Sequence, residues 1–148
     1  MYEKILIPTD GSSTSQQAIV HGLELAAAMS SEVTFLHVIE NPLTTGYATP
    51  ETLPYSAQLY DDLKTSGSDV LAKAEAMARE RGVSSHSVLV ENREPAQAIA
   101  EAGEEHDLIV MGTHGRRGFN RWMFGSVAEG ALRRGNKPFL LIRAPEED

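Results

Sequence analysis

The stretch Gly112-Thr113-His114-Gly115 is followed, after nine further residues, by Gly125-Ser126 at the start of a helix-like segment. The run before it, Asp107-Leu108-Ile109-Val110-Met111, is short and apolar, which is typical of a buried strand. Glycines let a backbone approach a ligand closely, and the first turn of a helix presents free N–H groups that attract an anion. A strand, a glycine turn, a loop and a helix start in this order predict a place for phosphate groups.

The rest of the chain alternates strand-like and helix-like segments. Short apolar runs predict strands at residues 2–8, 32–39, 85–90, 108–111 and 139–142. Helix signals predict helices over residues 13–29, 57–81, 94–103 and 126–135. Ser13 and Gln16 predict a capping box at the first helix, and Gly82 is expected to end the second. Three prolines predict a loop from Glu40 to Tyr55.

This alternation predicts an α/β fold, with right-handed crossovers and a parallel sheet that carries helices on both faces. Because the chain has no linker and no internal repeat, residues 1–148 are expected to form one domain. The expected architecture is an open, Rossmann-like, five-stranded sheet with the common strand order 3-2-1-4-5. Ligands of such sheets bind beyond the carboxyl ends of the strands, where the strand order reverses. The Thr9-Asp10-Gly11 turn and the Gly112 turn should therefore face one crevice.

Composition excludes several classes of protein. The chain has 148 residues and no cysteine, which excludes a disulfide scaffold, a thiolate metal site and a thiol nucleophile. No apolar stretch is long enough to span a membrane and no signal peptide is visible, so a cytoplasmic location without membrane insertion is expected. The net charge of −8 argues against nucleic-acid binding.

The basic residues gather around the glycine pattern. Between Gly112 and Lys137 the chain carries a net charge of +5, whereas the remainder carries −13. This local excess fits a small polyanion such as the phosphate tail of a nucleotide. Arg133 and Arg134 are assigned to the end of the last helix, where cations are favourable. Arg116 and Arg117 precede that helix, so they are expected to contact phosphate.

The glycine pattern, Gly-x-x-Gly followed by nine residues and Gly-Ser, resembles that of the ATP-binding branch of the universal stress protein family. Residues 5–12 resemble the opening strand and turn of that family, and residues 36–38 resemble the end of its second strand. Residues 137–142 resemble its last strand. The resemblance covers essentially the whole chain, and it implies an adenine-nucleotide site at the predicted crevice.

By this resemblance, Asp10 and Val38 lie at the adenosine end, and Pro8 and Thr9 shape the first loop. Glycines of the fourth loop would fold closely around ribose and phosphates, and the start of the last helix would offer N–H groups and a hydroxyl. The residues expected to contact nucleotide are Pro8, Thr9, Asp10, Val38, Met111, Gly112, His114, Gly115, Arg116, Arg117, Gly125, Ser126 and Val127. The expected ligand is ATP, with AMP and ADP left open, accompanied by Mg²⁺ held mainly through phosphate oxygens and water.

Two of these residues also have simpler interpretations, and a nearby histidine outside the list is interpreted as structural. Asp10 could be a turn residue that accepts a hydrogen bond from its own backbone. Ser126 with Glu129 could form a capping box that serves only the last helix. His37 is interpreted as a buried histidine whose hydrogen bonds are satisfied, rather than as a ligand.

No catalytic residue can be nominated. The chain has no Walker pattern, no protein-kinase signature and no recognisable serine–histidine–acid set. The expected function is therefore a cytoplasmic ATP-binding stress-response or regulatory protein whose nucleotide state alters its conformation or its binding to an unidentified protein partner. The alternatives are a structural or interaction dimer that binds no nucleotide, and a slow ATP hydrolase.

The last strand, Phe139-Leu140-Leu141-Ile142, is expected at an edge of the sheet. Native proteins rarely leave such an apolar edge bare. Antiparallel pairing of two copies about a two-fold axis would cover it, and it resembles the way the family dimerises. A homodimer through residues 139–142 is therefore expected.

Overall fold

The computed structural model describes residues 1–40, 49–51, 53–113 and 125–143. These residues form strands and helices in the predicted alternation. The strands are Lys4–Pro8 (β1), Glu32–Ile39 (β2), Ser85–Glu91 (β3), Leu108–Gly112 (β4) and Phe139–Ile142 (β5). The helices are Ser13–Met29 (α1), Leu53–Glu80 (α2), Pro95–Gly103 (α3) and Ser126–Arg134 (α4).

The strands form one parallel sheet with the order β3-β2-β1-β4-β5, which confirms the predicted α/β, Rossmann-like topology. Pro8 at the end of β1 lies opposite Leu36 of β2, and Gly112 at the end of β4 lies opposite Ile142 of β5. Because all the strands run in one direction, their carboxyl ends meet at one edge of the sheet. β1 and β4 lie at the centre, and β3 and β5 lie at the two margins.

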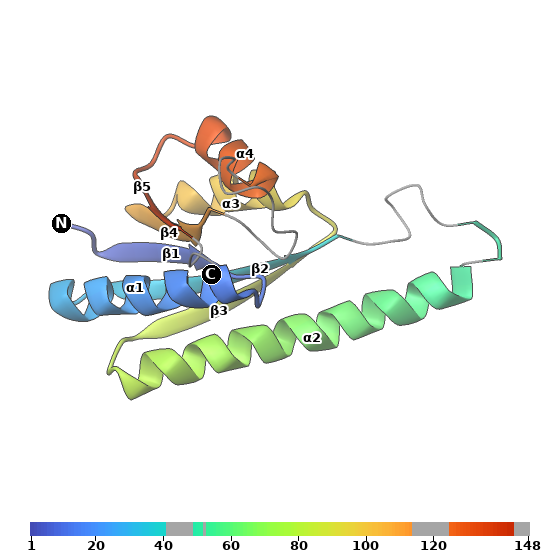
Figure 1. The fold of residues 1–148 in the computed structure, drawn as a ribbon, viewed down its shortest axis with the longest axis horizontal. Helices are drawn as coiled ribbons and strands as arrows, with labels where there is room; N and C mark the ends of the chain where they lie inside the picture. Colours follow the sequence, from blue (N-terminus) through green and yellow to red (C-terminus); the bar gives the residue numbers. More distant parts are fainter. Residues whose placement is uncertain (41–48, 52, 114–124, 144–148) are drawn as a thin grey trace, which may run out of the picture.

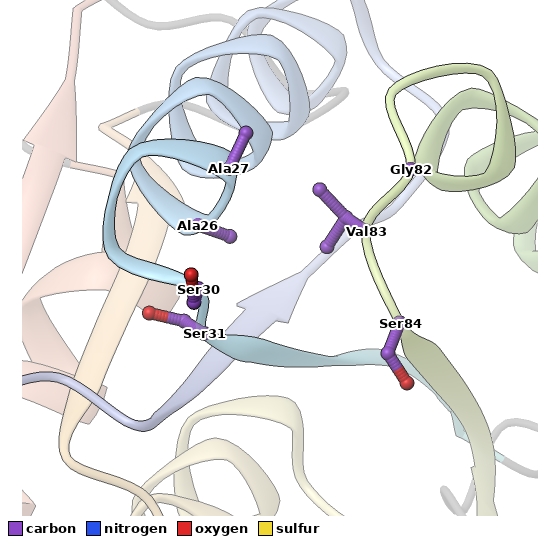
Figure 2. A pocket seen from close by; sticks show the side chains of 7 residues that line it. All are labelled: Ala26, Ala27, Ser30, Ser31, Gly82, Val83 and Ser84. Atoms are coloured by element: carbon purple, nitrogen blue, oxygen red, sulfur yellow. The ribbon is translucent and has the colours of Figure 1, made fainter.

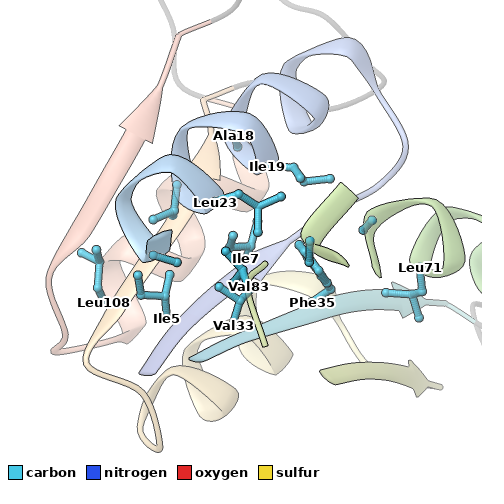
Figure 3. Packing of buried hydrophobic residues seen from close by; sticks show 14 residues of the cluster. Ile5, Ile7, Ala18, Ile19, Leu23, Val33, Phe35, Leu71, Val83 and Leu108 are labelled. Atoms are coloured by element: carbon cyan, nitrogen blue, oxygen red, sulfur yellow. The ribbon is translucent and has the colours of Figure 1, made fainter. Parts of the chain in front are cut away.

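Two helical layers cover the sheet, α1 and α2 on one face and α3 and α4 on the other (Figure 1). The side chains of β1 divide between the layers, since Ile5 and Ile7 pack under α1 and α2 whereas Leu6 packs under α3 and α4. Figure 3 shows the first layer, in which Leu23 of α1 and Phe35 of β2 belong to the same cluster as Ile7. Burying each such side chain contributes about 1.5–3 kcal/mol, so the two clusters fix the helices on the sheet.

The first helix begins differently from the prediction. Its N-cap is Ser12, whose side chain accepts a hydrogen bond from the Ser15 N–H. The predicted capping box of Ser13 with Gln16 is therefore wrong, and Ser13 is the first helical residue. The preceding turn explains this choice, because Gly11 has a positive φ of 82°, which directs the chain so that Ser12 takes the cap position.

The second helix begins at Leu53, four residues before the predicted start and within the segment expected to be a loop. Pro54 lies in its first turn, where the missing N–H has no partner to lose. The first buried residue of the helix is Gly67, and Figure 1 shows the preceding half of α2 extending past the sheet. Gly82 follows the helix with φ +68°, which confirms the predicted stop.

Candidate functional site

The candidate site lies at the carboxyl ends of β1 and β4. These strands are neighbours, with Ile5 opposite Leu108 and Leu6 opposite Ile109. After β1 the chain crosses to β2 on one side, and after β4 it crosses to β5 on the other. The strand order therefore reverses between β1 and β4. Open α/β sheets bind their ligands at such a reversal, and we call this edge the crevice. The Asp10 turn and the Gly112 turn both leave the sheet here, as predicted.

Hydroxyl groups are buried beside this crevice. In the described part of the chain, four of the five buried polar residues lie there, and they are Thr9, Thr14, Ser15 and Thr113. Buried polar groups need hydrogen-bond partners, so such a concentration indicates a built network rather than an apolar core. Of these four residues, only Thr9 was predicted to shape the site. The run of hydroxyl side chains from Ser12 to Ser15 was the signal for Thr14 and Ser15.

Thr9 is held from several directions. Its N–H donates to the Leu36 carbonyl at 2.8 Å, and its hydroxyl donates to Ser15 Oγ at 3.1 Å. Its carbonyl lies 2.8 Å from His37 Nδ1. A carbonyl oxygen only accepts, so Nδ1 carries the hydrogen. The course of the first loop is thus fixed at the residue that precedes Asp10. His37 is hydrogen-bonded at Nδ1, as interpreted from the sequence, but its side chain is half-buried rather than buried.

Asp10 forms the turn that leads into α1. Its Oδ1 accepts a hydrogen bond from the Ser12 N–H at 2.9 Å, and Ser12 in turn caps the helix. The simpler interpretation of Asp10 as a turn residue is therefore confirmed. A carboxylate has about four acceptor positions, so this bond and a contact with a bound molecule are compatible.

Gly112 is required by packing against α1. A Cβ atom at this position would lie 2.5 Å from Thr14 Cγ2 and 3.3 Å from the Thr14 carbonyl carbon. Neither distance leaves room for a side chain, so the first turn of α1 approaches β4 only because residue 112 is glycine. This glycine joins the two sides of the crevice.

The two halves of the glycine pattern come together at the start of α4. The Gly125 N–H donates to the Thr113 carbonyl at 2.6 Å, which closes the segment between them. Gly125 is the N-cap of α4, and no side-chain hydrogen bond caps this helix among the described residues. The Ser126–Glu129 capping box is therefore wrong. Ser126 is the first helical residue and is exposed, and the Glu129 carboxylate pairs with Arg133 instead.

Of the remaining residues predicted to contact nucleotide, some pack within the fold and others lie outside the described part of the chain. Val38 and Met111 pack with the cluster under α3 and α4, and Met111 is only 6% exposed, so its side chain belongs to the core. Pro8, the last residue of β1, is buried. Four residues lie outside the described part of the chain, and they are His114, Gly115, Arg116 and Arg117.

The described charged side chains of α4 form two ion pairs, and one of them includes Glu129 in the first turn of the helix. Arg134 Nη1 lies 2.8 Å from Glu94 Oε1 at the beginning of α3, and Arg133 pairs with Glu129. Both arginines lie in the last turn of α4, which agrees with their assignment to the helix C-terminus. The pairing with Arg133 offsets the charge of the Glu129 carboxylate in the first turn, and neither of these two arginines lies at the start of α4.

The described residues contain no metal cluster, and they line a hollow away from the crevice. No three histidine or carboxylate side chains gather as a metal site in this part of the chain. A hollow of about 250 Å³ lies between the ends of α1 and α2, lined by Ala26, Ala27, Ser30, Ser31, Gly82, Val83 and Ser84 (Figure 2). It lies at the amino ends of β2 and β3, opposite the crevice, and presents no titratable side chain. No described helix is long and apolar enough to cross a membrane.

The chain was compared with known proteins. The family model of the universal stress protein family matches residues 1–143. Universal stress protein MJ0531 of Methanocaldococcus jannaschii is 35% identical over 150 aligned residues, which cover 100% of this chain and 86% of that protein. The structure of protein MJ0577 of the same organism has a TM-score of 0.84 and 26% identity, covering 99% of both chains.

Two more distant structures share the fold and hold nucleotides. A family protein of Arabidopsis thaliana, solved with AMP bound, has a TM-score of 0.69 and 18% identity, covering 96% of this chain and 92% of that one. The universal stress protein of Archaeoglobus fulgidus, solved with dAMP, has a TM-score of 0.65 and 22% identity, covering 95% and 98%. From the match of the family model over almost the whole length, the chain belongs to the universal stress protein family.

Proposed function

We propose that this protein binds an adenine nucleotide in the crevice between the Asp10 turn and the start of α4, and that the bound nucleotide regulates it. The observation that carries the proposal is the hydrogen bond from Gly125 to Thr113, which brings both halves of the glycine pattern to the edge where the strand order reverses. Family proteins that share the fold hold AMP and dAMP, which supports an adenine nucleotide as the ligand class.

The start of α4 is the proposed phosphate site. Its first-turn N–H groups have no acceptor within the helix, and its cap residue, Gly125, has no side chain to occupy them. Ser126 and Val127 are exposed at this point, so their N–H groups and the Ser126 hydroxyl are the proposed phosphate contacts. His114, Gly115, Arg116 and Arg117 are proposed to complete this end.

The adenosine end is proposed to lie across the crevice, beside the end of β1 and the end of β2. Asp10 follows the end of β1, and Val38 lies at the end of β2. The Thr9 carbonyl links the two strand ends, because it accepts a hydrogen bond from His37 Nδ1. ATP is the proposed ligand, with Mg²⁺ held chiefly by its phosphate oxygens. We propose binding, in the cytoplasm, rather than hydrolysis as the function, because the chain has no Walker pattern and no protein-kinase signature.

Self-association through β5 is part of the proposal. β5 lies at a margin of the sheet, and Leu140 is 38% exposed. Two copies that pair this edge antiparallel would satisfy its backbone groups and cover Leu140. We propose a homodimer of single-domain chains whose surface for a protein partner depends on the nucleotide.

Calorimetric titration of the purified protein with ATP and AMP, after any bound nucleotide is removed and identified by mass, tests the binding proposal. Wild type should bind an adenine nucleotide, and Gly115→Val should abolish the heat while circular dichroism shows an unchanged fold. Asn136→Val, which adds the same side chain at an exposed position after α4, should bind as wild type does. If wild type shows no heat, the protein is instead a structural family member.

Light scattering tests the dimer separately. Wild type should have twice the mass of one chain at micromolar concentration, and Leu140→Glu should have the mass of one chain. A dimer that binds no nucleotide would favour the interaction function. A wild-type monomer would contradict the β5 interface and leave the nucleotide proposal standing.

A further inference from the structure

His37 lies between the crevice and α2. Its neighbours in β2, Phe35 and Val33, pack in the cluster under α1 and α2, so the residue of the same parity also faces that layer. The adjacent Val38 faces the opposite layer and contributes to the cluster under α3 and α4. His37 is thus a half-buried polar side chain in an otherwise apolar row that ends at Ile39.

The imidazole extends the attachment of the first loop to the sheet. Pro8 is the last residue of β1 that pairs with β2, and the Thr9 N–H makes one further backbone bond to Leu36. Beyond that point the Thr9 carbonyl accepts from His37 Nδ1 at 2.8 Å. The side chain of His37 therefore holds the last peptide group before Asp10.

Gly67 of α2 supports the imidazole from behind. A Cβ atom at Gly67 would lie 2.7 Å from His37 Cδ2 and 3.1 Å from His37 Nε2. Gly67 is also the first buried residue of α2, at the point where the helix meets the sheet. A glycine in a helix interior costs about 0.5–1 kcal/mol relative to alanine, so the close approach to His37 gives a reason for its presence.

We propose that His37 is a positioning residue for the nucleotide site, and that Gly67 sets its orientation. The chain of contacts runs from α2 through Gly67 and His37 to the Thr9 carbonyl, and from there to Asp10 at the adenosine end. A movement of α2 at Gly67 would thereby change affinity for the nucleotide. This inference rests on the proposed function, but its first test does not need a nucleotide.

Nitrogen-15 NMR of the imidazole, without any ligand, gives the first test. The hydrogen bond to a carbonyl requires the hydrogen on Nδ1, so the Nδ1–H tautomer should be found for His37. In His37→Leu the amide resonances from Thr9 to Ser12 should shift and exchange faster with solvent. In His37→Asn, whose amide nitrogen can reach the position of Nδ1, these resonances should stay close to those of wild type.

Titration with AMP gives the second test. His37→Leu leaves the Thr9 carbonyl without this donor, so affinity for AMP should fall about tenfold, whereas His37→Asn should recover most of it. The matched control is His86→Asn on the neighbouring strand β3, where Nε2 lies 3.1 Å from Glu32 Oε1 at the other end of the sheet. It should bind AMP as wild type does.

Gly67→Ala tests the support from α2. The added methyl group should displace the imidazole and lower AMP affinity by about the same factor as His37→Leu. Its control is Gly103→Ala in α3, where a Cβ atom would lie 2.5 Å from Ile109 Cδ1. Both substitutions should lower the melting temperature, but only Gly67→Ala should change AMP affinity.

The outcomes separate the two proposals. An Nε2–H tautomer, or unchanged first-loop resonances in His37→Leu, would overturn the positioning role whether or not nucleotide binds. Equal AMP affinity in wild type and His37→Leu would overturn it while leaving the proposed function intact. A wild type that binds no adenine nucleotide, with the expected tautomer and loop shifts, would contradict the proposed function and leave His37 as a residue that positions the first loop alone.

Discussion

The helices α1 and α4 both begin at the carboxyl edge of the sheet, yet their first turns are built differently. α1 is capped by its own sequence, since Ser12 Oγ accepts from the Ser15 N–H and Asp10 accepts from the Ser12 N–H. α4 is preceded by Gly125, which has no side chain, and no described side chain caps it. The Gly125 N–H donates to the Thr113 carbonyl instead.

This difference separates a helix start that serves the fold from one that is proposed to serve a ligand. A capped first turn has part of its N–H groups satisfied internally, so it offers less to an anion. A first turn behind a glycine keeps them for an external acceptor. Two helices at the same edge can thus have different roles, and the residue before each helix decides which.

Gly112→Val should have the largest effect, because it disrupts the close approach of the first turn of α1 to the end of β4. The new side chain would overlap Thr14 in the first turn of α1, and overpacking of this kind costs about 3 kcal/mol. Urea denaturation should show this loss in the free energy of unfolding, and nucleotide binding should be lost as well. Unchanged stability would show that α1 and β4 are not in close contact.

Ser12→Ala should remove the cap of α1 and cost about 1 kcal/mol of unfolding free energy. Ser126→Ala is its counterpart in α4, and it should change stability by less than about 0.5 kcal/mol because Ser126 is not a cap. The order should reverse for ATP affinity, which Ser126→Ala should lower more than Ser12→Ala. Equal losses of stability in both variants would contradict the comparison.

A negative charge at the two helix starts sharpens the comparison further. Ser126→Asp should stabilise the free protein by about 0.5 kcal/mol, because an acid is favourable in the first turn of a helix. It should also lower ATP affinity about tenfold, because like charges repel at the proposed phosphate site. Ser13→Asp, at the same position of α1, should give a similar gain in thermal stability and a smaller loss of affinity by calorimetry.

The smallest effect is expected at Asp107, at the opposite edge of the sheet, where acid should lower the stability of the fold. Asp107 Oδ2 accepts from the Glu3 and Lys4 N–H groups, at 3.0 Å and 2.9 Å, and these bonds lower the pKa of Asp107 below its ordinary value of 3.8. The carboxylate therefore stabilises the fold above about pH 3.8, and this stabilisation is lost as the pH falls through the lowered pKa.

Thermal melts of wild type and Asp107→Asn between pH 2 and pH 7 measure this effect. The two melting temperatures should converge at the acid end, because the protonated Asp107 resembles the amide. Neither ATP affinity nor its dependence on Ser126 should change. A variant that remains less stable by the same amount at every pH would contradict a role for the ionised carboxylate.

The sequence predicted the sheet, its strand order and the edge that carries the crevice, because hydrophobic periodicity and glycine positions are local signals. Helix starts were less predictable. Ser12 and Ser13 are both good caps, and the positive φ of Gly11 chooses between them. Pro54 fits a loop as well as a first turn, and the helix includes it.

The candidate site divides in the same way. Its location followed from the glycine spacing and the strand order, both visible along the chain. The contact of Gly112 with Thr14 and that of Gly67 with His37 join residues far apart in sequence, so only the folded arrangement reveals them. Gly112 was predicted only as a point of close approach to a ligand and Gly67 was given no role, whereas packing supplies a reason for both glycines.

The bond between the Thr113 carbonyl and the Gly125 N–H makes the segment between these residues an exchangeable insert. Its two ends are joined by the framework of the fold, so the framework does not depend on the length of what connects them. For a flexible connection between two fixed ends, doubling the length costs only about 0.6 kcal/mol in closure entropy. Family members, or engineered versions of this chain, could therefore exchange residues 114–124 for other sequences and acquire a new specificity on an unchanged scaffold.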